Sequence, residues 1–342
     1  MTLKKQWDSD NKQNNGRAQF NKVIVDSDSA NQQNVYIGGL QNRFLVVSKS
    51  DPGNITYTFD RADDKSKKGL SDVSAYRVKE YVIIGSGQGT LYKVTAGDAN
   101  RDWSKKLGSA ITGRPVANSS QVHTSTNDGR IVTYEYEMGN QQWSTDVGDG
   151  IYSPLRRDSN FVYATTKDGE LVVLGTTNGE EKWRESFAPF GNAGPALGDD
   201  KVYVASDEVY AYDAFSSRNR VWKSDGFGGS IGSTPVYSDK TVYVGSEDGK
   251  IYALSTDPVS DQIKWTFDTG SPVAGGPAVN AAGTRIAVMS TDGKVYVLGN
   301  NGSKKQEISD DGKIAEDSRS TPTFQNGALY FGDRNGIVWK YE

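Results

Sequence analysis

The sequence predicts an all-β protein, an eight-bladed β-propeller of four-stranded antiparallel blades, and three observations support this. A pattern of two short strands around an Asp-Gly or Asn-Gly turn returns along the chain about every 40 residues. A tryptophan follows most copies, and a small-residue segment with a proline precedes most of them. Each repeat therefore supplies four short strands, which is the content of one propeller blade.

The hairpin pattern is clearest in Val242–Leu254, which reads VYVGSEDGKIYAL. Alternating apolar residues around Asp-Gly are the strongest local hairpin signal, because both central residues of a type I′ turn need positive φ. We therefore expect type I′ turns at these positions and no phosphate-binding loop. The other copies, of which the last two are degenerate, are Tyr81–Val94, Gln121–Tyr134, Phe161–Leu174, Arg285–Leu298, Ala328–Tyr341, Val35–Val47 and Lys201–Tyr212.

The residues that flank each hairpin predict the other two strands of the repeat. A proline-containing segment such as Gly113–Ala117 or Gly275–Val279 leads the first strand. An aromatic at one fixed place per repeat suits the wedge between neighbouring blades, so we assign these residues a structural role. The aromatic residues that lead the fourth strand are Tyr57, Trp103, Trp143, Trp183, Trp222 and Trp265.

The two ends of the chain are predicted to complete one blade together. The last copy ends at Glu342 without a fourth strand, and a matching segment, Leu3–Trp7 (LKKQW), stands at the other end. The N-terminal strand is therefore expected to close the ring within a single domain over residues 1–342. The predicted blades cover residues 20–60, 72–106, 111–146, 151–187, 194–224, 231–268, 273–308, and 320–342 with 3–7.

Composition excludes several classes of function. The net charge of −4 and the scattered Lys and Arg residues argue against nucleic-acid binding by bulk charge. The absence of cysteine excludes disulfides, thiolate metal sites and cysteine nucleophiles. No apolar run is long enough to span a bilayer, so no membrane insertion is expected. The sequence starts without an apolar leader or a lipid-anchor cysteine, and an extracytoplasmic or particle-surface location is still the favoured expectation.

Candidates for catalysis and for metal or cofactor binding are few. The one histidine, His123, occupies the place of Tyr203 and Tyr243 in other copies and is expected to be a strand residue. The acidic segments Asp26–Asn34 and Ser309–Asp317 lack the spacing of a calcium-binding loop and are expected to be solvated connections. No catalytic residue or cofactor is therefore predicted, and calcium binding by the acidic segments stays open as an alternative.

A partner surface is predicted on the face where the crossings between blades and the hairpin turns emerge together. Three consecutive crossings carry aromatic residues on glycine-rich loops, which would form an apolar anchor patch centred on blades three to six. The alternative, that these rings fold down between the blades, stays open, and Phe190 is expected to be exposed. The predicted partner-binding residues are Tyr152, Phe187, Phe190 and Phe227, with Arg156 and Arg157 at the margin of the patch.

The segments Lys93–Trp103, Val173–Trp183 and Ala253–Trp265 resemble the PQQ-like propeller repeat, whose loose pattern is Ala-x-Asp-x-x-Thr-Gly-x-x-x-Trp. That family includes quinoprotein dehydrogenases, which hold a quinone with calcium, and BamB-like scaffolds of outer-membrane β-barrel assembly. Because this chain lacks cysteine and the length for cofactor loops, it is most similar to the ligand-free, BamB-like branch.

The resemblance implies a non-catalytic scaffold that binds protein partners. Two alternatives stay open at this point. The chain could be a surface module of a virus particle or cell coat that binds a receptor or glycan, or a quinoprotein-type dehydrogenase.

Overall fold

The computed structural model describes residues 5–8, 23–25, 34–38, 43–48, 55–60, 74–78, 80–95, 100–187, 193–215, 220–257, 262–335 and 337–342. For the strands that precede residue 74 it describes the backbone alone. Apart from the short 3-10 helix η1 (Asp310–Gly312), the regular structure of these residues consists of β-strands. The all-β prediction is confirmed.

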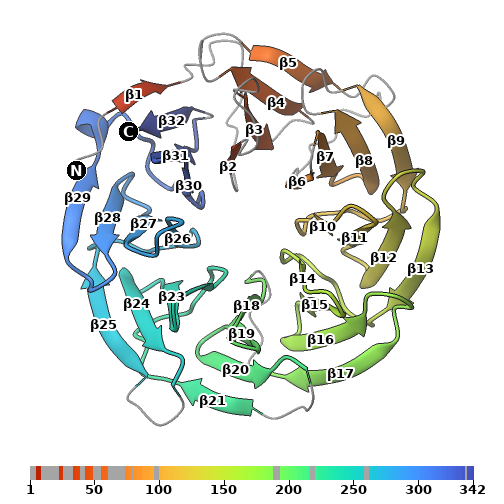
Figure 1. Ribbon diagram of the computed structural model, residues 1–342. Helices are drawn as coiled ribbons and strands as arrows, with labels where there is room; N and C mark the ends of the chain where they lie inside the picture. The colour runs from red at the N-terminus through yellow and green to blue at the C-terminus, as the bar shows by residue number, and fades with distance from the viewer. Residues whose placement is uncertain are drawn as a thin grey trace.

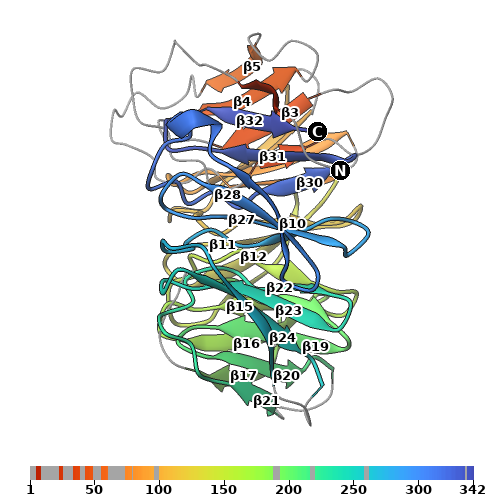
Figure 2. The same ribbon diagram turned by 90° about the vertical axis from the view of Figure 1, so that its left-hand side faces the viewer.

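Over the described residues, strands β2 to β29 form seven consecutive sheets, each of four antiparallel strands that pair in chain order. The sheets surround a central axis like propeller blades, with the first strand of each sheet innermost and the fourth at the rim (Figure 1). Figure 2 shows the same arrangement from the side. The predicted four-stranded repeat and the propeller architecture are therefore confirmed.

The strands of the first four sheets are β2 (Val23–Val25), β3 (Asn34–Gly38), β4 (Arg43–Ser48) and β5 (Ile55–Asp60); β6 (Ser74–Val78), β7 (Tyr81–Gly85), β8 (Thr90–Thr95) and β9 (Arg101–Lys106); β10 (Val116–Ala117), β11 (Gln121–Ser125), β12 (Arg130–Glu135) and β13 (Gln141–Asp146); and β14 (Arg156–Arg157), β15 (Phe161–Thr165), β16 (Glu170–Gly175) and β17 (Glu181–Ser186). The strands of the next three sheets are β18 (Ala196–Gly198), β19 (Lys201–Ala205), β20 (Val209–Asp213) and β21 (Arg220–Ser224); β22 (Val236–Ser238), β23 (Thr241–Gly245), β24 (Lys250–Ser255) and β25 (Ile263–Asp268); and β26 (Ala278–Val279), β27 (Arg285–Met289), β28 (Val295–Gly299) and β29 (Lys304–Ile308).

A further sheet combines segments from the two ends of the chain. Its strands are β30 (Thr323–Gln325), β31 (Ala328–Gly332), β32 (Val338–Tyr341) and β1 (Lys5–Asp8), in the order β1-β32-β31-β30. β1 runs antiparallel to β32, with Trp7 opposite Lys340 and Asp8 opposite Trp339. Lys5–Trp7 of the segment LKKQW therefore lie in the strand that pairs with the last strand of the chain.

The hairpin turns differ from the sequence prediction in their conformation. In the turn that closes β23 and β24, the backbone N–H of Gly249 donates to the carbonyl of Ser246 at 3.2 Å. Only the glycine has positive φ, at 85°, so the predicted type I′ assignment is wrong. The turn is of type I, followed by a left-handed glycine. Consecutive residues with positive φ occur instead between the first and second strands, at Asp199–Asp200 and Asp239–Lys240.

The apolar core lies between neighbouring sheets. One cluster joins Tyr243 and Ile251 of one sheet to Ile286, Val288 and Tyr296 of the next, all at most 4% exposed. Because a sheet in this position has a neighbour on each face, the middle strands are buried on both faces, as in β23 and β28. Stacking of the repeats therefore supplies the burial that one repeat could not achieve alone.

Candidate functional site

The segments that cross from one sheet to the next lie against the hairpin turns, so both share one face of the molecule, as predicted. Backbone hydrogen bonds fix four of the described crossings to the hairpin turn of the sheet that each one enters. The N–H of the turn residue donates to a carbonyl of the crossing in the pairs Asn127 to Ala110 and Lys167 to Gly150, both at 2.8 Å, and Glu247 to Ser230 and Thr291 to Pro272, both at 2.9 Å. The loops of this face are thus held at fixed positions.

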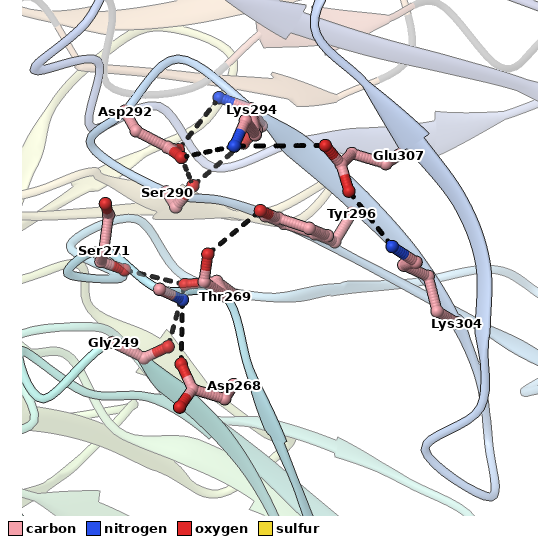
Figure 3. Close-up of polar contacts among 11 residues, drawn as sticks. Gly249, Asp268, Thr269, Ser271, Ser290, Asp292, Lys294, Tyr296, Lys304 and Glu307 are labelled. Atoms are coloured by element: carbon pink, nitrogen blue, oxygen red, sulfur yellow. Dashed lines mark hydrogen bonds and ion pairs between the residues drawn. The ribbon is translucent and has the colours of Figure 1, made fainter.

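Figure 3 shows the seam between the sheet of β22–β25 and the sheet of β26–β29. Thr269, just after β25, donates to the carbonyl of Gly249 through both its backbone N–H and its hydroxyl, each at 2.8 Å. The hydroxyl of Tyr296, on the next sheet, donates to the carbonyl of Thr269 at 2.9 Å. One buried threonine therefore ties a hairpin turn, a crossing and the neighbouring sheet together.

The charged groups beside this seam neutralise one another. Lys294 pairs with Asp292 at 3.2 Å and with Glu307 at 3.9 Å, and Lys304 pairs with Glu307 at 3.1 Å (Figure 3). All four side chains are substantially exposed, so these are surface ion pairs of small energetic weight. These four charges therefore compensate one another.

Tryptophans connect neighbouring sheets at the rim. The indole Nε1 of Trp143 donates to the carbonyl of Thr176 in the next sheet at 2.9 Å. Gly179 in the same outer turn, with φ of 67°, lies flat on the indole, because a Cβ there would come 2.4 Å from Cε3 of Trp143. The wedge role predicted for the tryptophans is therefore confirmed, while the side chain of Tyr57 lies outside the described part of the structure. The same arrangement recurs in the pairs Trp103 with Gly139 and Trp265 with Gly302.

The aromatic residues predicted to bind a partner lie at different depths. The side chain of Tyr152 is 36% exposed. Phe187 is half-buried with its ring centroid 6.0 Å from that of Tyr210, and Phe227 is half-buried at 4.8 Å from Tyr252. Phe190 lies outside the described residues. Partner binding by these residues stays a prediction, and the packing of Phe187 and Phe227 favours the alternative that they fold between sheets.

The two arginines assigned to the margin of that patch belong to the first strand of their sheet, and their role in partner binding stays a prediction. Arg156 and Arg157 form β14, the innermost strand of its sheet, and are half-buried near the axis. The proline-led segment Tyr152–Arg156 thus leads into the first strand of its sheet, as the repeat pattern predicts. Burial, and secondarily the charge of the neighbouring Arg114, lowers the pKa of Arg156, which still leaves the guanidinium protonated at neutral pH.

A family model and a solved structure match this chain over most or all of its length. A family model described as "Outer membrane protein assembly factor BamB" matches residues 58–188 and 167–342. The chain belongs to this family. The crystal structure of BamB from Moraxella catarrhalis aligns over 100% of both chains, with a TM-score of 0.75 and 18% sequence identity.

A designed protein shares the fold of this BamB-family chain. The computationally designed Ika8 protein aligns over 95% of this chain and 96% of its own, with a TM-score of 0.78 and 17% identity. At such identities the structural likeness establishes the fold alone. A comparison with curated proteins finds no match.

The histidine of this BamB-family chain lies on β11 and is fully buried. His123 is 0% exposed, its Nδ1 lies 2.6 Å from the hydroxyl of Thr133, and its ring centroid lies 5.8 Å from that of Trp143. Burial, with a smaller contribution from the charge of Arg157, lowers the pKa of His123 to about 3. The imidazole is therefore neutral at physiological pH and is a strand residue, as predicted.

The acidic segments show no metal-binding arrangement among the described residues. In the segment 309–317, Asp317 pairs with Arg334 at 2.7 Å, while the segment 26–34 lies outside the described residues except for Asn34. Within the described part of the chain, no group of three or more His, Asp or Glu side chains is placed to hold a metal ion. The same residues include no helix of the length and hydrophobicity needed to cross a membrane.

Sequence reasoning missed a buried lysine. The Nζ of Lys93 lies 4.1 Å from the ring centroid of Tyr81 and 4.2 Å from that of Tyr136, and it pairs with Asp102 at 2.8 Å. Two aromatic faces and a carboxylate compensate the charge of a side chain that is 0% exposed. The signal was present in the sequence, because Lys93 stands where most other hairpins have an apolar residue, with Thr133 and Lys340 as the other exceptions.

Proposed function

We propose that this BamB-family chain is a non-catalytic scaffold for protein partners, built as a closed ring of eight blades. The observation that carries the proposal is the family match, which spans residues 58–342, together with a fold likeness to BamB over the whole chain. The family is described as an outer membrane protein assembly factor. The partner class we propose is accordingly proteins of outer-membrane assembly.

The pairing of β1 with β32 supports the closed ring of eight blades. Seven sheets follow one another from β2 to β29, and the sheet of β30, β31, β32 and β1 would be the eighth blade between the last and the first of them. This eighth sheet contacts both of its neighbours, through β26 with β30 and β2 with β30. A strand borrowed from the other end of the chain hides the seam and stiffens the disc.

The crossing face of blades three to six is the proposed docking surface. Its loops are fixed by backbone hydrogen bonds to the hairpin turns, so little conformational entropy is lost when a partner binds. Tyr152 is the described aromatic of the set with the greatest exposure, and a large amphipathic side chain on a rigid loop is a suitable anchor. Phe187 and Phe227 would support this surface from beneath.

The one histidine supports a non-catalytic role. General base and nucleophile activation by histidine require an imidazole within reach of the substrate and a pKa near the working pH. His123 is 0% exposed and its pKa is lowered to about 3, so it meets neither condition.

The test is capture of partners from the native source by the immobilised chain, with the captured proteins identified by mass spectrometry. A Tyr152→Ser, Phe190→Ser double variant is expected to capture at least about 90% less of the outer-membrane assembly proteins. This is the loss of affinity expected when one or two anchor residues are removed from an interface. The matched control is Met138→Ser, which removes a side chain that is 70% exposed in the turn between β12 and β13, on the opposite face. Undiminished capture by the double variant would refute the docking surface, and capture of no assembly protein by the wild type would refute the partner class.

A further inference from the structure

A group of basic side chains lies at the axis on one side of the propeller. Arg156 and Arg157 make up β14, and Arg114 stands two residues before β10, the innermost strand of the preceding sheet. The guanidinium carbon of Arg114 lies 5.8 Å from the ring centroid of Tyr76 on β6, the innermost strand of the sheet before that. Three consecutive innermost strands thus bring these residues together. The innermost strands β18, β22, β26 and β30 carry only uncharged residues.

Two of the three arginines interact electrostatically with each other, and all three share a neighbour. The charge of Arg114 lowers the pKa of Arg156, and the Tyr76 hydroxyl interacts electrostatically with all three guanidinium groups. All three side chains are half-buried, so water reaches them although they are enclosed by protein on most sides.

These guanidinium groups lack acidic partners in the described part of the chain. The Nε atoms of Arg114 and Arg157 are buried without a hydrogen-bond partner. Arg156 donates only to the carbonyl of Leu155, at 3.2 Å. None of the three forms an ion pair with a described residue, in contrast to Arg130, Arg184 and Arg334 elsewhere in the fold.

The nearest acidic group to Arg157 is engaged elsewhere. One carboxylate oxygen of Asp158 accepts hydrogen bonds from the backbone N–H groups of Asn160 and Phe161, both at 2.7 Å, and the other accepts from the hydroxyl of Tyr163 at 2.7 Å. Its charge reaches Arg157 only at longer range. Within the described part of the chain, no carboxylate therefore forms an ion pair with this cluster.

Like charges gathered in a partly desolvated place are unfavourable unless an opposite charge compensates them. We propose that Arg114, Arg156 and Arg157 bind a small oxyanion that carries at least two negative charges, on the propeller axis. A guanidinium group presents a planar fork of N–H donors that matches phosphate and carboxylate oxygens, and the buried Nε atoms are donors of this kind. The Tyr76 ring supports Arg114 from the side. This site goes beyond the scaffold role and does not depend on it.

The test measures thermal unfolding at neutral pH in sodium phosphate, in disodium succinate and in sodium chloride, all at one ionic strength. One of the two dianions is expected to raise the unfolding midpoint of the wild type by about 2 °C or more above chloride. Isothermal titration calorimetry with the same anion should give one site per chain. A response to phosphate alone assigns a phosphate-bearing ligand, and a response to succinate alone assigns a dicarboxylate.

Variants connect the effect to the cluster. Arg114→Gln with Arg156→Gln is expected to abolish the anion-dependent rise, whereas Arg334→Gln, at an exposed ion pair, is expected to retain it. Arg156→Lys keeps the positive charge but loses the planar set of N–H donors, so it should weaken anion binding about tenfold. This single variant provides the test if the double variant does not fold. No rise above chloride with either dianion would overturn the proposal, and so would an equal rise in the wild type and the cluster variants.

Discussion

Two kinds of seam join the sheets at the rim, and the difference between them shows what the repeat pattern specifies. In the first kind, Trp143 donates to a carbonyl of the next sheet and a left-handed glycine, Gly179, packs against its ring. In the second kind, the indole nitrogens of Trp183 and Trp222 are buried with no hydrogen-bond partner among the described residues. The tryptophan therefore recurs as an apolar wedge, and the hydrogen bond is added only where the next turn allows it.

The outer turn of the next sheet accounts for this difference. The turn between β16 and β17 contains Thr-Asn-Gly, whereas the segments that follow β20 and β24, residues 214–219 and 256–262, contain no glycine. A glycine lets the backbone lie within contact distance of the indole face, as the Cβ position at Gly179 demonstrates. Aromatic neighbours accompany the tryptophan in both kinds of seam, such as Tyr212 beside Trp183 at 6.3 Å and Tyr134 beside Trp103 at 6.2 Å.

The largest effect is expected when a methyl group is placed between the glycine and the tryptophan. Gly179→Ala puts a Cβ 2.4 Å from the Trp143 ring at a residue with φ of 67°, so it should lower the free energy of unfolding by about 3 kcal/mol or more. Gly148→Ala is the matched control, because Gly148 has φ of 91° but no atom within 4 Å of its Cβ position. We expect the control to cost about 1 kcal/mol in urea unfolding. Equal costs would mean that the close contact with the indole contributes nothing.

The next effect is the pH dependence of the seam that contains His123. The folded-state pKa of His123, about 3, lies below the unfolded value near 6.5, so the unfolded chain binds the additional proton. Neutral His123 therefore contributes fully to the free energy of unfolding above pH 6.5. This contribution is lost as the pH falls, by about 3 kcal/mol at pH 4.

The control for this prediction is His123→Tyr, which installs the residue found at Tyr203 and Tyr243. The free energy of unfolding is measured in urea at pH 7 and at pH 4. Between these pH values the variant should lose about 3 kcal/mol less than the wild type. Parallel pH profiles for the two proteins would show that His123 does not titrate below its ordinary pKa.

A smaller effect separates the two kinds of seam directly. Trp103→Phe removes the donor to the carbonyl of Tyr136, while Trp222→Phe removes an indole N–H that has no partner among the described residues. Trp103→Phe is therefore expected to destabilise by about 1 kcal/mol more than Trp222→Phe, the net value of one hydrogen bond. Thermal or urea unfolding of the two variants measures this difference. The reverse order would show that the hydrogen bond is not what distinguishes the seams.

The sequence was sufficient for features that recur at fixed spacing. Gly249 and its counterparts located the hairpins, and the tryptophans located the outer strands, because each repeat must satisfy the same backbone and packing constraints. The turn type was not predictable from Asp-Gly alone, since whether Asp248 also adopts positive φ depends on where the neighbouring strands end. The spacing of residues in the sequence thus predicts where strands and turns lie better than it predicts the backbone conformation of a turn.

Features that involve different repeats were harder to predict. Arg114 and Arg156 belong to different sheets and follow no periodic pattern, so only the propeller geometry brings them together at the axis. Phe187 and Phe227 stand on glycine-rich loops that suggest exposure, yet each packs against a tyrosine. Whether such a ring points outward or inward depends on the neighbouring sheet, which is not apparent within a single repeat.

The most direct test of the account is the removal of residues 1–8, because they include β1, the strand that pairs with β32. If the chain's own end completes the last sheet, the truncated protein should unfold at a midpoint several degrees lower, and a synthetic peptide of residues 1–8 should restore part of the loss by strand addition. An unchanged midpoint, with no effect of the peptide, would contradict a ring closed by the N-terminal strand.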